Sequence, residues 1–204
     1  MKIKQLYFLL PILVLSACGP SDQPESGTTV SEVPETVDLK TYEGLGTQIT
    51  AASFLTLSGK VKSAMQEGGV TNAVEYCKVS AYPIIDSLSQ AHNASISRTS
   101  LKPRNYKNSP VPREKSVLKQ FEVDWQLGKE VMPFAEDMGA AGINFYAPIW
   151  TQKACLQCHG VIGETLTAKN DGIIKGLYPN DKATGYKEND LRGMWVVNFK
   201  KDQQ

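Results

Sequence analysis

One pentapeptide constrains this chain more than any other feature: Cys155-Leu-Gln-Cys158-His159. Its two thiols have the spacing at which they add to the two vinyl groups of one porphyrin, and the histidine that follows then lies under the iron. The motif predicts one covalently bound haem c, with Cys155 and Cys158 as attachment points and His159 as an axial ligand. Any fold of this chain must place these three side chains around a single haem.

Two other kinds of site use the same cysteine spacing. A thioredoxin-like redox pair follows a strand in a βαβ pattern, and the residues around Ala154 have no such pattern. A zinc site needs further Cys or His ligands, but the whole chain contains only four Cys and two His. The sequence therefore favours haem attachment over both alternatives.

Covalent haem attachment of this kind takes place outside the cytoplasm, and the N-terminus predicts the required export. Two lysines precede an apolar stretch over residues 6–15, which is too short to span a membrane as a mature helix. The run Leu15-Ser-Ala-Cys18 then resembles the lipobox of bacterial lipoproteins, which implies a signal peptide over residues 1–17 and acyl chains on Cys18. An ordinary signal peptide with an unmodified cysteine is the alternative.

The expected location is the periplasm, with the protein held at a membrane by its lipid. Gly19 stands where an inner-membrane retention signal would have Asp, so the sequence favours the outer membrane. Residues 18–41 are mostly Ser, Pro, Glu, Thr and Gly and cannot bury enough apolar surface to fold, so they predict a flexible tether. Residues 42–204 are long enough for one domain with its own core. The net charge of +1, without a basic block, argues against a nucleic-acid partner.

Helical periodicity marks residues 48–67 and 70–90, which the pair Gly68-Gly69 separates. Pro83 lies inside the second pattern and is expected to kink or end that helix. Several strands follow the helices, which predicts the α+β class with an antiparallel sheet. The expected elements are a strand over 94–99, a loop over 102–112, a helix over 113–127 closed by Gly128, an antiparallel pair over 130–137 and 143–150, and a last strand over 193–199.

Cys77 is the thiol that remains once Cys18 is assigned to lipid and the motif cysteines to haem. A free thiol outside the cytoplasm is a liability unless it is buried or used. It belongs to an apolar helical stripe that should face the interior and that comprises Val70, Val74, Cys77, Ala81 and Ile84. Cys77 is therefore a candidate second ligand of the iron, and an inert buried thiol is the alternative. The other candidate ligands are His92, in a polar link, and the methionines Met65, Met132, Met138 and Met194.

Four motifs, in one order, resemble a known family. They are Asn72-Ala-Val-Glu-Tyr-Cys-Lys78, Ser97-Arg-Thr-Ser-Leu-Lys-Pro-Arg-Asn105, Ala154-Cys-Leu-Gln-Cys-His-Gly160, and Tyr178-Pro-Asn-Asp-Lys-Ala-Thr-Gly-Tyr186 with Asp190-Leu-Arg-Gly193. The chain resembles the family of single-haem c-type domains with a PAS-like fold, which also occur as sensory input modules of bacterial signalling proteins. The resemblance implies a PAS-like antiparallel sheet with N-terminal helices, and an iron held between His159 and Cys77.

The haem propionates need cationic partners, and Arg98 and Arg104 suit that bidentate, charge-assisted role. Ordinary surface charge is the alternative for both arginines. The resemblance also implies that Tyr178 lies near the haem edge. It implies the same position, without a distinct role for each, for Lys182, Tyr186 and Arg192.

Ligation by a thiolate stabilises ferric iron, so a His/Cys pair predicts a low reduction potential. The sequence then favours a membrane-tethered periplasmic electron carrier that works with a redox partner protein. The alternative is a haem-based sensor of redox state or of CO, NO or O2, which would act through a signalling partner because this sequence shows no output segment. An enzyme is less favoured, since two axial ligands leave no open iron site.

Overall fold

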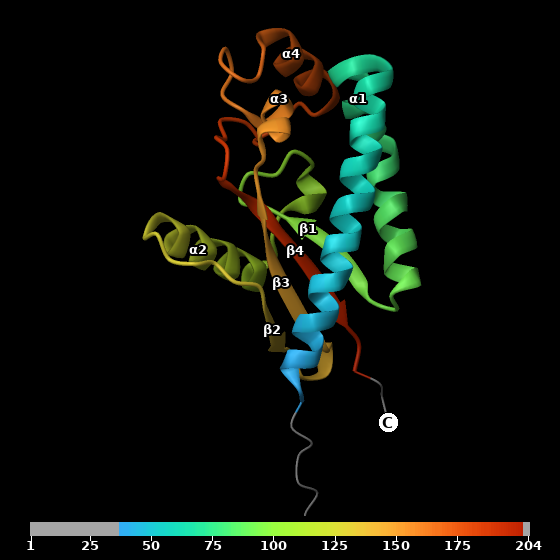
Figure 1. Ribbon diagram of the computed structural model, residues 1–204, viewed down its shortest axis with the longest axis vertical. Helices are drawn as coiled ribbons and strands as arrows, with labels where there is room; N and C mark the ends of the chain where they lie inside the picture. Colours follow the sequence, from blue (N-terminus) through green and yellow to red (C-terminus); the bar gives the residue numbers. More distant parts are fainter. Residues whose placement is uncertain (1–36, 202–204) are drawn as a thin grey trace, which may run out of the picture. The chain divides into compact units, whose positions relative to one another are not determined.

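The computed structural model describes residues 37–201 of the chain (Figure 1). The predicted signal peptide, Cys18 and nearly all of the predicted tether lie outside these residues. The described part forms four strands, β1 Ser95–Thr99, β2 Phe134–Asp137, β3 Ile143–Trp150 and β4 Leu191–Phe199. Its α-helices are α1 Leu39–Ala91, α2 Pro112–Gln126, α3 Leu156–His159 and α4 Ala168–Leu177. The predicted α+β class is confirmed.

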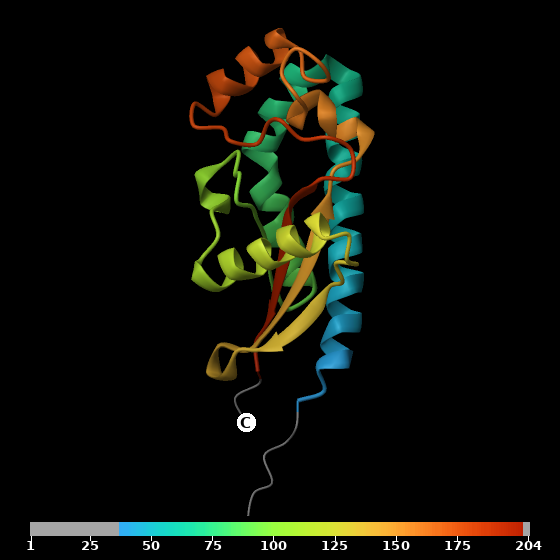
Figure 2. The same ribbon diagram turned by 90° about the vertical axis from the view of Figure 1, so that its left-hand side faces the viewer.

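The strands form one antiparallel sheet in the order β1-β4-β3-β2. The two central strands, β3 and β4, are rich in β-branched and aromatic residues, which suit a pleated, buried surface. Phe145 and Val197 point to the core under α1, whereas Tyr146 and Val196 point to the core under α2. Each face of the sheet is therefore covered by one helical element, as Figure 2 shows.

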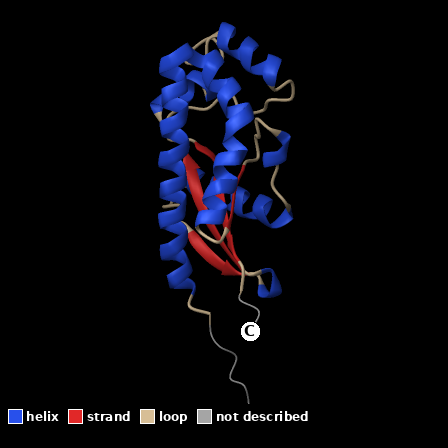
Figure 3. Cartoon of the chain, turned by 90° about the vertical axis from the view of Figure 1, so that its right-hand side faces the viewer, coloured by secondary structure: helices blue, strands red, loops and turns tan. Residues whose placement is uncertain are grey.

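α1 is a hairpin of two arms. Gly68 and Gly69 have non-helical backbone angles, and the φ of +68° at Gly69 is one that glycine adopts without steric cost. The arms over 39–67 and 70–91 run back alongside each other (Figures 1 and 3), and the prediction of two helices separated at this pair is confirmed. The amide of Asn72 closes the turn by donating to the carbonyl of Ala64 at 2.9 Å.

The second arm of α1 continues with helical backbone angles past Pro83, so the expectation that the helix could end there is wrong. Ala81 and Ile85 are buried on either side of the proline and hold the arm in the core. Pro83 itself is exposed, so water can satisfy the carbonyl that its ring leaves without a helical partner. Packing therefore outweighs the local cost of the proline.

The first arm begins earlier than expected, at Leu39, inside the segment assigned to the tether. The Asp38 carboxylate caps this end, because it accepts a hydrogen bond from the Lys40 N–H at 3.1 Å. Further along the arm, Gly46 lies against the sheet so closely that a Cβ there would overlap the Phe145 ring. The absence of a side chain at this position lets α1 approach β3.

The other predicted elements lie close to their expected positions. α2 ends just before Gly128, whose φ is +69°. β2 begins at Phe134 rather than at residue 130, because Pro133 has no N–H for a sheet hydrogen bond. α3 and α4 have no counterpart among the expected elements. No helix within residues 37–201 is both long and apolar enough to cross a membrane.

α3 and α4 lie at the end of the sheet where β3 finishes, beside the glycine turn of α1 (Figure 1). Val70 and Val74 of α1 form a small core there with Leu166 and with Ile174 of α4. The pairing of β3 with β4 loses its regular register between Ile149 and Trp150, just before the chain enters this region. Such irregularities often re-aim side chains next to binding sites.

Candidate cofactor site

A cavity of about 760 Å³ lies between α1, the ends of β1, β3 and β4, and α3. Its volume is typical of pockets for cofactors and drug-sized ligands, which span roughly 300–1,000 Å³. Every site residue predicted within the described part of the chain lines it: Cys77, Arg98, Arg104, Cys155, Cys158, His159 and Tyr178. Cys18 lies outside the described residues. The fold therefore gathers in one place side chains that are up to about a hundred residues apart in the sequence.

The motif itself lies on two short helical turns. Cys155 ends the 3₁₀ turn Lys153–Cys155, and Cys158 and His159 belong to α3. All three side chains are partly buried and line the cavity. A helix of one turn is not stable alone, so its position depends on the contacts that neighbouring segments make with it.

His159 is held in the form that binds metals. Its Nδ1 lies 2.8 Å from the carbonyl oxygen of Ala183, so Nδ1–H donates to that oxygen and Nε2 is left without a proton. Burial lowers the pKa of the imidazole well below its ordinary value, and the nearby charges of Arg192 and Arg104 act in the same direction. The ring is therefore neutral, with an unprotonated nitrogen available as a ligand.

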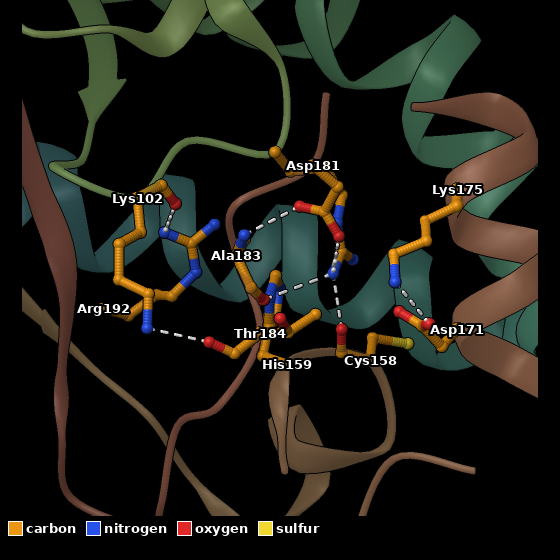
Figure 4. A network of polar contacts seen from close by, with 10 residues as sticks. Lys102, Cys158, His159, Asp171, Lys175, Asp181, Ala183, Thr184 and Arg192 are labelled. Atoms are coloured by element: carbon orange, nitrogen blue, oxygen red, sulfur yellow. Dashed lines mark hydrogen bonds and ion pairs between the residues drawn. The ribbon is translucent and has the colours of Figure 1, made fainter. Parts of the chain in front are cut away.

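Arg104 fastens the motif to the segment 181–186. Its guanidinium donates to the carbonyl oxygens of Cys158 and Ala183 and forms an ion pair with Asp181 at 3.3 Å. The other carboxylate oxygen of Asp181 accepts from the N–H of Ala183 at 2.8 Å. Figure 4 shows Cys158, Asp181 and Ala183 converging on this point. The same carbonyl of Ala183 orients His159, so one network fixes both the helix and its imidazole.

Backbone hydrogen bonds continue this attachment. The N–H of Gly185 donates to the carbonyl of Gly160 at 2.8 Å, and the N–H of Tyr186 donates to the carbonyl of His159 at 3.0 Å. The ring of Tyr186 also meets the imidazole edge-on, with 6.4 Å between centroids. The motif histidine is thus enclosed by main chain and side chain from residues 183–186.

The charges around the cavity are of one sign. Among residues 37–201, four basic side chains and no acidic one line it; the basic ones are Lys62, Arg98, Arg104 and Arg192. Arg104 is paired with Asp181, but no ion pair joins Arg98 or Arg192 to another residue within 37–201. A cavity with this balance suits an anionic occupant, because buried cations are stable only when their charge is compensated.

Arg192 is the arginine that the sequence left without a role. It donates to the Ser100 hydroxyl at 2.8 Å and to the Lys102 carbonyl at 3.2 Å, and its Nε is buried without a partner in the described chain. Its guanidinium also lies over the ring of Tyr186, 5.3 Å from the centroid. Burial is the main reason why the pKa of Arg192 falls below its usual value.

Cys77 faces the cavity from the second arm of α1. Burial raises the pKa of its thiol, while the charges of Arg98 and Arg104 oppose that rise. The rival ligands differ in position. His92 is exposed at the end of α1 and is not part of the lining, and Met194 is fully buried under α2. Met65 does line the cavity, so two sulfur atoms, a thiol and a thioether, remain as candidate second ligands.

Tyr178 directly follows α4, lines the cavity and packs against the small core around Val70. Burial raises the pKa of its phenol, and the Cys77 thiol adds to that effect.

Sequence reasoning missed Asp181 and Ala183 as site residues. Both lie inside a motif that the resemblance had marked, but Ala183 acts through its carbonyl, for which a sequence gives no signal.

Residues 28–199 of the chain match the model of the Tll0287-like family. Among solved structures, the crystal structure of the cyanobacterial heme-protein Tll0287 is similar, with 24% sequence identity and a TM-score of 0.55. The match covers 79% of this chain and 98% of that one, which shows that the two share a fold. No protein with a curated description matches the chain.

Proposed function

This chain belongs to the Tll0287-like family, and from that premise we propose that it is a haem protein with one haem c in the cavity between α1, β1, β4 and α3. The solved relative is described as a heme-protein. The observation that carries the proposal is the lining of this cavity, which brings together the thiols of Cys155 and Cys158, the oriented imidazole of His159 and a further thiol, Cys77.

The residues present fit a haem in charge as well as in donor set. A bound haem would supply one-electron redox chemistry at its iron, and it would add two anionic propionates. The thiols of Cys155 and Cys158 would hold it covalently, and Nε2 of His159 would be the proximal ligand. Unpaired cations in the lining, above all Arg98 and Arg192, would compensate the anionic charge.

Cys77 is the second axial ligand in this proposal. Its thiol lines the cavity, and the family resemblance of its segment implies the same role. Met65 is the competing sulfur. A thioether is neutral, whereas a thiolate is an anionic donor that favours ferric iron, so the two ligands give different potentials and spectra. We expect the low potential of a thiolate.

The function that this site supports best is electron transfer. Ligation by both His159 and Cys77 would leave the iron without an open position for a substrate, which would suit an electron carrier better than a catalyst. The resemblance to a lipobox at Cys18 and the predicted tether before α1 support a location in the periplasm, with the lipid anchored in the outer membrane. The partner would then be a periplasmic redox protein.

One observation favours a second function, the sensing of redox state or of a small gas. Cys77 lies eight residues after Gly69, where α1 leaves helical geometry, so the arm that carries the distal sulfur begins at a glycine turn and not inside a continuous helix. Displacement of the arm would free the iron for CO, NO or O2. A sensor of this kind would work through a signalling partner.

The haem proposal is tested with protein matured in a host that has a c-type haem assembly system. We expect haem to remain on the chain through acid–acetone extraction and denaturing gels, and to be lost from the Cys155→Ala/Cys158→Ala variant. Haem that extracts freely from the wild type contradicts the proposal. The two functions are separated on the same sample: a reversible potential without ferrous CO binding supports the carrier, and ready CO binding supports the sensor.

The distal ligand is tested by three matched variants. Cys77→Ser should keep the covalent haem, remove the thiolate features of the ferric optical and EPR spectra, and raise the potential, because an anionic donor is lost. Met65→Leu and His92→Ala should leave spectrum and potential nearly unchanged. A spectrum altered by Met65→Leu and not by Cys77→Ser would assign the thioether as the ligand.

A further inference from the structure

The imidazole of His159 is fixed at one point by the hydrogen bond from its Nδ1 to the carbonyl oxygen of Ala183, 2.8 Å away. This bond selects the nitrogen that stays free for a metal, but a ring held by one hydrogen bond can still tilt about the line that joins donor and acceptor. Tilting turns Nε2 away from the position that a ligand to iron must keep. A functional side chain needs its rotamer locked by packing as well as by hydrogen bonds. A second contact on the His159 ring is therefore required.

Tyr186, which the sequence left without a distinct role, supplies that contact. Its ring centroid lies 6.4 Å from the centroid of the His159 imidazole, and the two ring planes meet at 88°. This T-shaped arrangement is one that aromatic pairs prefer, and the distance is within their usual range of roughly 4.5–7 Å. The N–H of Tyr186 also donates to the carbonyl of His159 at 3.0 Å, so main chain and side chain of the tyrosine both reach the histidine. Tyr186 is only 6% exposed, so its ring is itself confined.

Two cations hold the ring of Tyr186. The ammonium of Lys102 lies 4.4 Å from the centroid of the ring, and the guanidinium of Arg192 lies 5.3 Å from it. A cation over an aromatic face is attracted by the negative charge of that face. Both cations are anchored in turn. Lys102 donates to the carbonyl of Thr184 at 2.8 Å (Figure 4). Arg192 donates to the hydroxyl of Ser100 at 2.8 Å. The ring is thus held from both the loop after β1 and the start of β4.

We propose that Tyr186 is a positioning residue of the proximal ligand: its ring sets the plane of the His159 imidazole and thereby the direction in which Nε2 points. The inference rests on the haem function proposed above. The carbonyl of Ala183 selects the free nitrogen, and the ring of Tyr186 selects the plane. Lys102 and Arg192 act one step further out, because they keep the ring of Tyr186 in place. The aromatic ring carries this role, so the phenol hydroxyl is not needed for it.

The test is the ferric EPR spectrum of the holoprotein, because the g values of a low-spin ferric haem depend on the orientation of the axial imidazole plane. Tyr186→Leu removes the ring and leaves Cys155 and Cys158 unchanged, so the haem should stay covalently bound. We expect its low-spin signal to shift and broaden, because the imidazole is no longer held in one plane. Tyr186→Phe keeps the ring and should keep the g values and line width of the wild type. Lys102→Met, which removes one of the two cations, should broaden the signal less than Tyr186→Leu.

Phe121→Leu is the matched control. It makes the same kind of change at another buried aromatic residue, which is 5% exposed and lies in the core under α2. It should lower the stability in urea unfolding but leave the EPR spectrum as in the wild type. A wild-type spectrum for Tyr186→Leu, or equal broadening in Tyr186→Phe or Phe121→Leu, would overturn the inference. If Tyr186→Leu yields no holoprotein, Lys102→Met decides, and an unbroadened signal there would overturn it as well. Haem that extracts freely from the wild type would instead contradict the proposed function.

Discussion

Removal of Arg104 should damage the whole motif end of the domain. Arg104 is the side chain that ties Cys158 of α3 to Asp181 and Ala183, beside the backbone hydrogen bonds between the two segments, and its ion-pair partner Asp181 has a fully buried side chain. The side chain of Arg104 is itself only 14% exposed. Arg104→Met keeps the length of the side chain but leaves a buried carboxylate without its cation, and it leaves the carbonyl of Cys158 without its donor.

The magnitude follows from the burial of this pair. Breaking a buried ion pair by removing one partner costs about 3–5 kcal/mol, because the remaining charge is uncompensated. For a domain of this size that corresponds to roughly 6–20 °C in Tm, at about 2–4 °C per kcal/mol. Replacing both partners, as in Arg104→Met/Asp181→Leu, removes the stranded charge and should recover much of the loss.

The assay is urea and thermal unfolding of the purified holoprotein, followed by far-UV circular dichroism. Arg113→Met is the matched control, since Arg113 pairs with Glu136 at 2.7 Å but the two side chains are 44% and 29% exposed. That exposed pair should contribute less than about 1 kcal/mol. Equal losses in Arg104→Met and Arg113→Met, or a double variant less stable than Arg104→Met, would refute the reasoning.

Two further predictions concern the first arm of α1 and the predicted anchor. Gly46→Ala should destabilise the domain by about 1–3 kcal/mol in urea unfolding, because the new Cβ would overlap an aromatic ring of β3. Gly44→Ala is the control: the space around Gly44 is open, so this substitution should stabilise the domain by roughly 0.5–1 kcal/mol. A similar effect of both substitutions would mean that α1 does not pack this closely. Native protein should partition with membranes, and Cys18→Ser should release it or block its processing; a soluble wild type with an unmodified N-terminus would contradict the lipoprotein hypothesis.

The elements that sequence reasoning predicted well are those whose signal is local. Gly68-Gly69 marks the turn of α1 because a positive φ is needed there, and Gly128 marks the end of α2 for the same reason. Alternating and β-branched residues marked the sheet strands. Pro83 shows the limit of local reasoning, since the buried neighbours of the proline hold the helix together where propensity alone would break it.

Long-range contacts gave no comparable signal. The sequence suggested Arg98 and Arg104 for the same task, yet Arg104 is engaged by Asp181 and two carbonyls, whereas Arg98 is free to face the cavity. Arg192 likewise forms no ion pair within residues 37–201, and its Nε is buried there without a hydrogen-bond partner. Which arginine is engaged depends on residues some eighty positions away in the chain, and a single sequence gives no signal for such a contact.

The two proposed iron ligands are held by different physical means, and this difference bears on function. His159 lies on a single helical turn that has little stability of its own, so hydrogen bonds from residues 183–186 and the two attachment cysteines beside it would fix its position. Cys77 lies on a long arm held by apolar packing and by the contact of Tyr82 with Asn108. The arm joins the rest of α1 at Gly68-Gly69, where the backbone leaves helical geometry, whereas the network around His159 cannot move without breaking several hydrogen bonds. A change in ligation should therefore begin with the loss of Cys77 from the iron. The stability of the arm that carries Cys77, more than the stability of the motif helix, should determine whether the haem only transfers electrons or also releases this ligand.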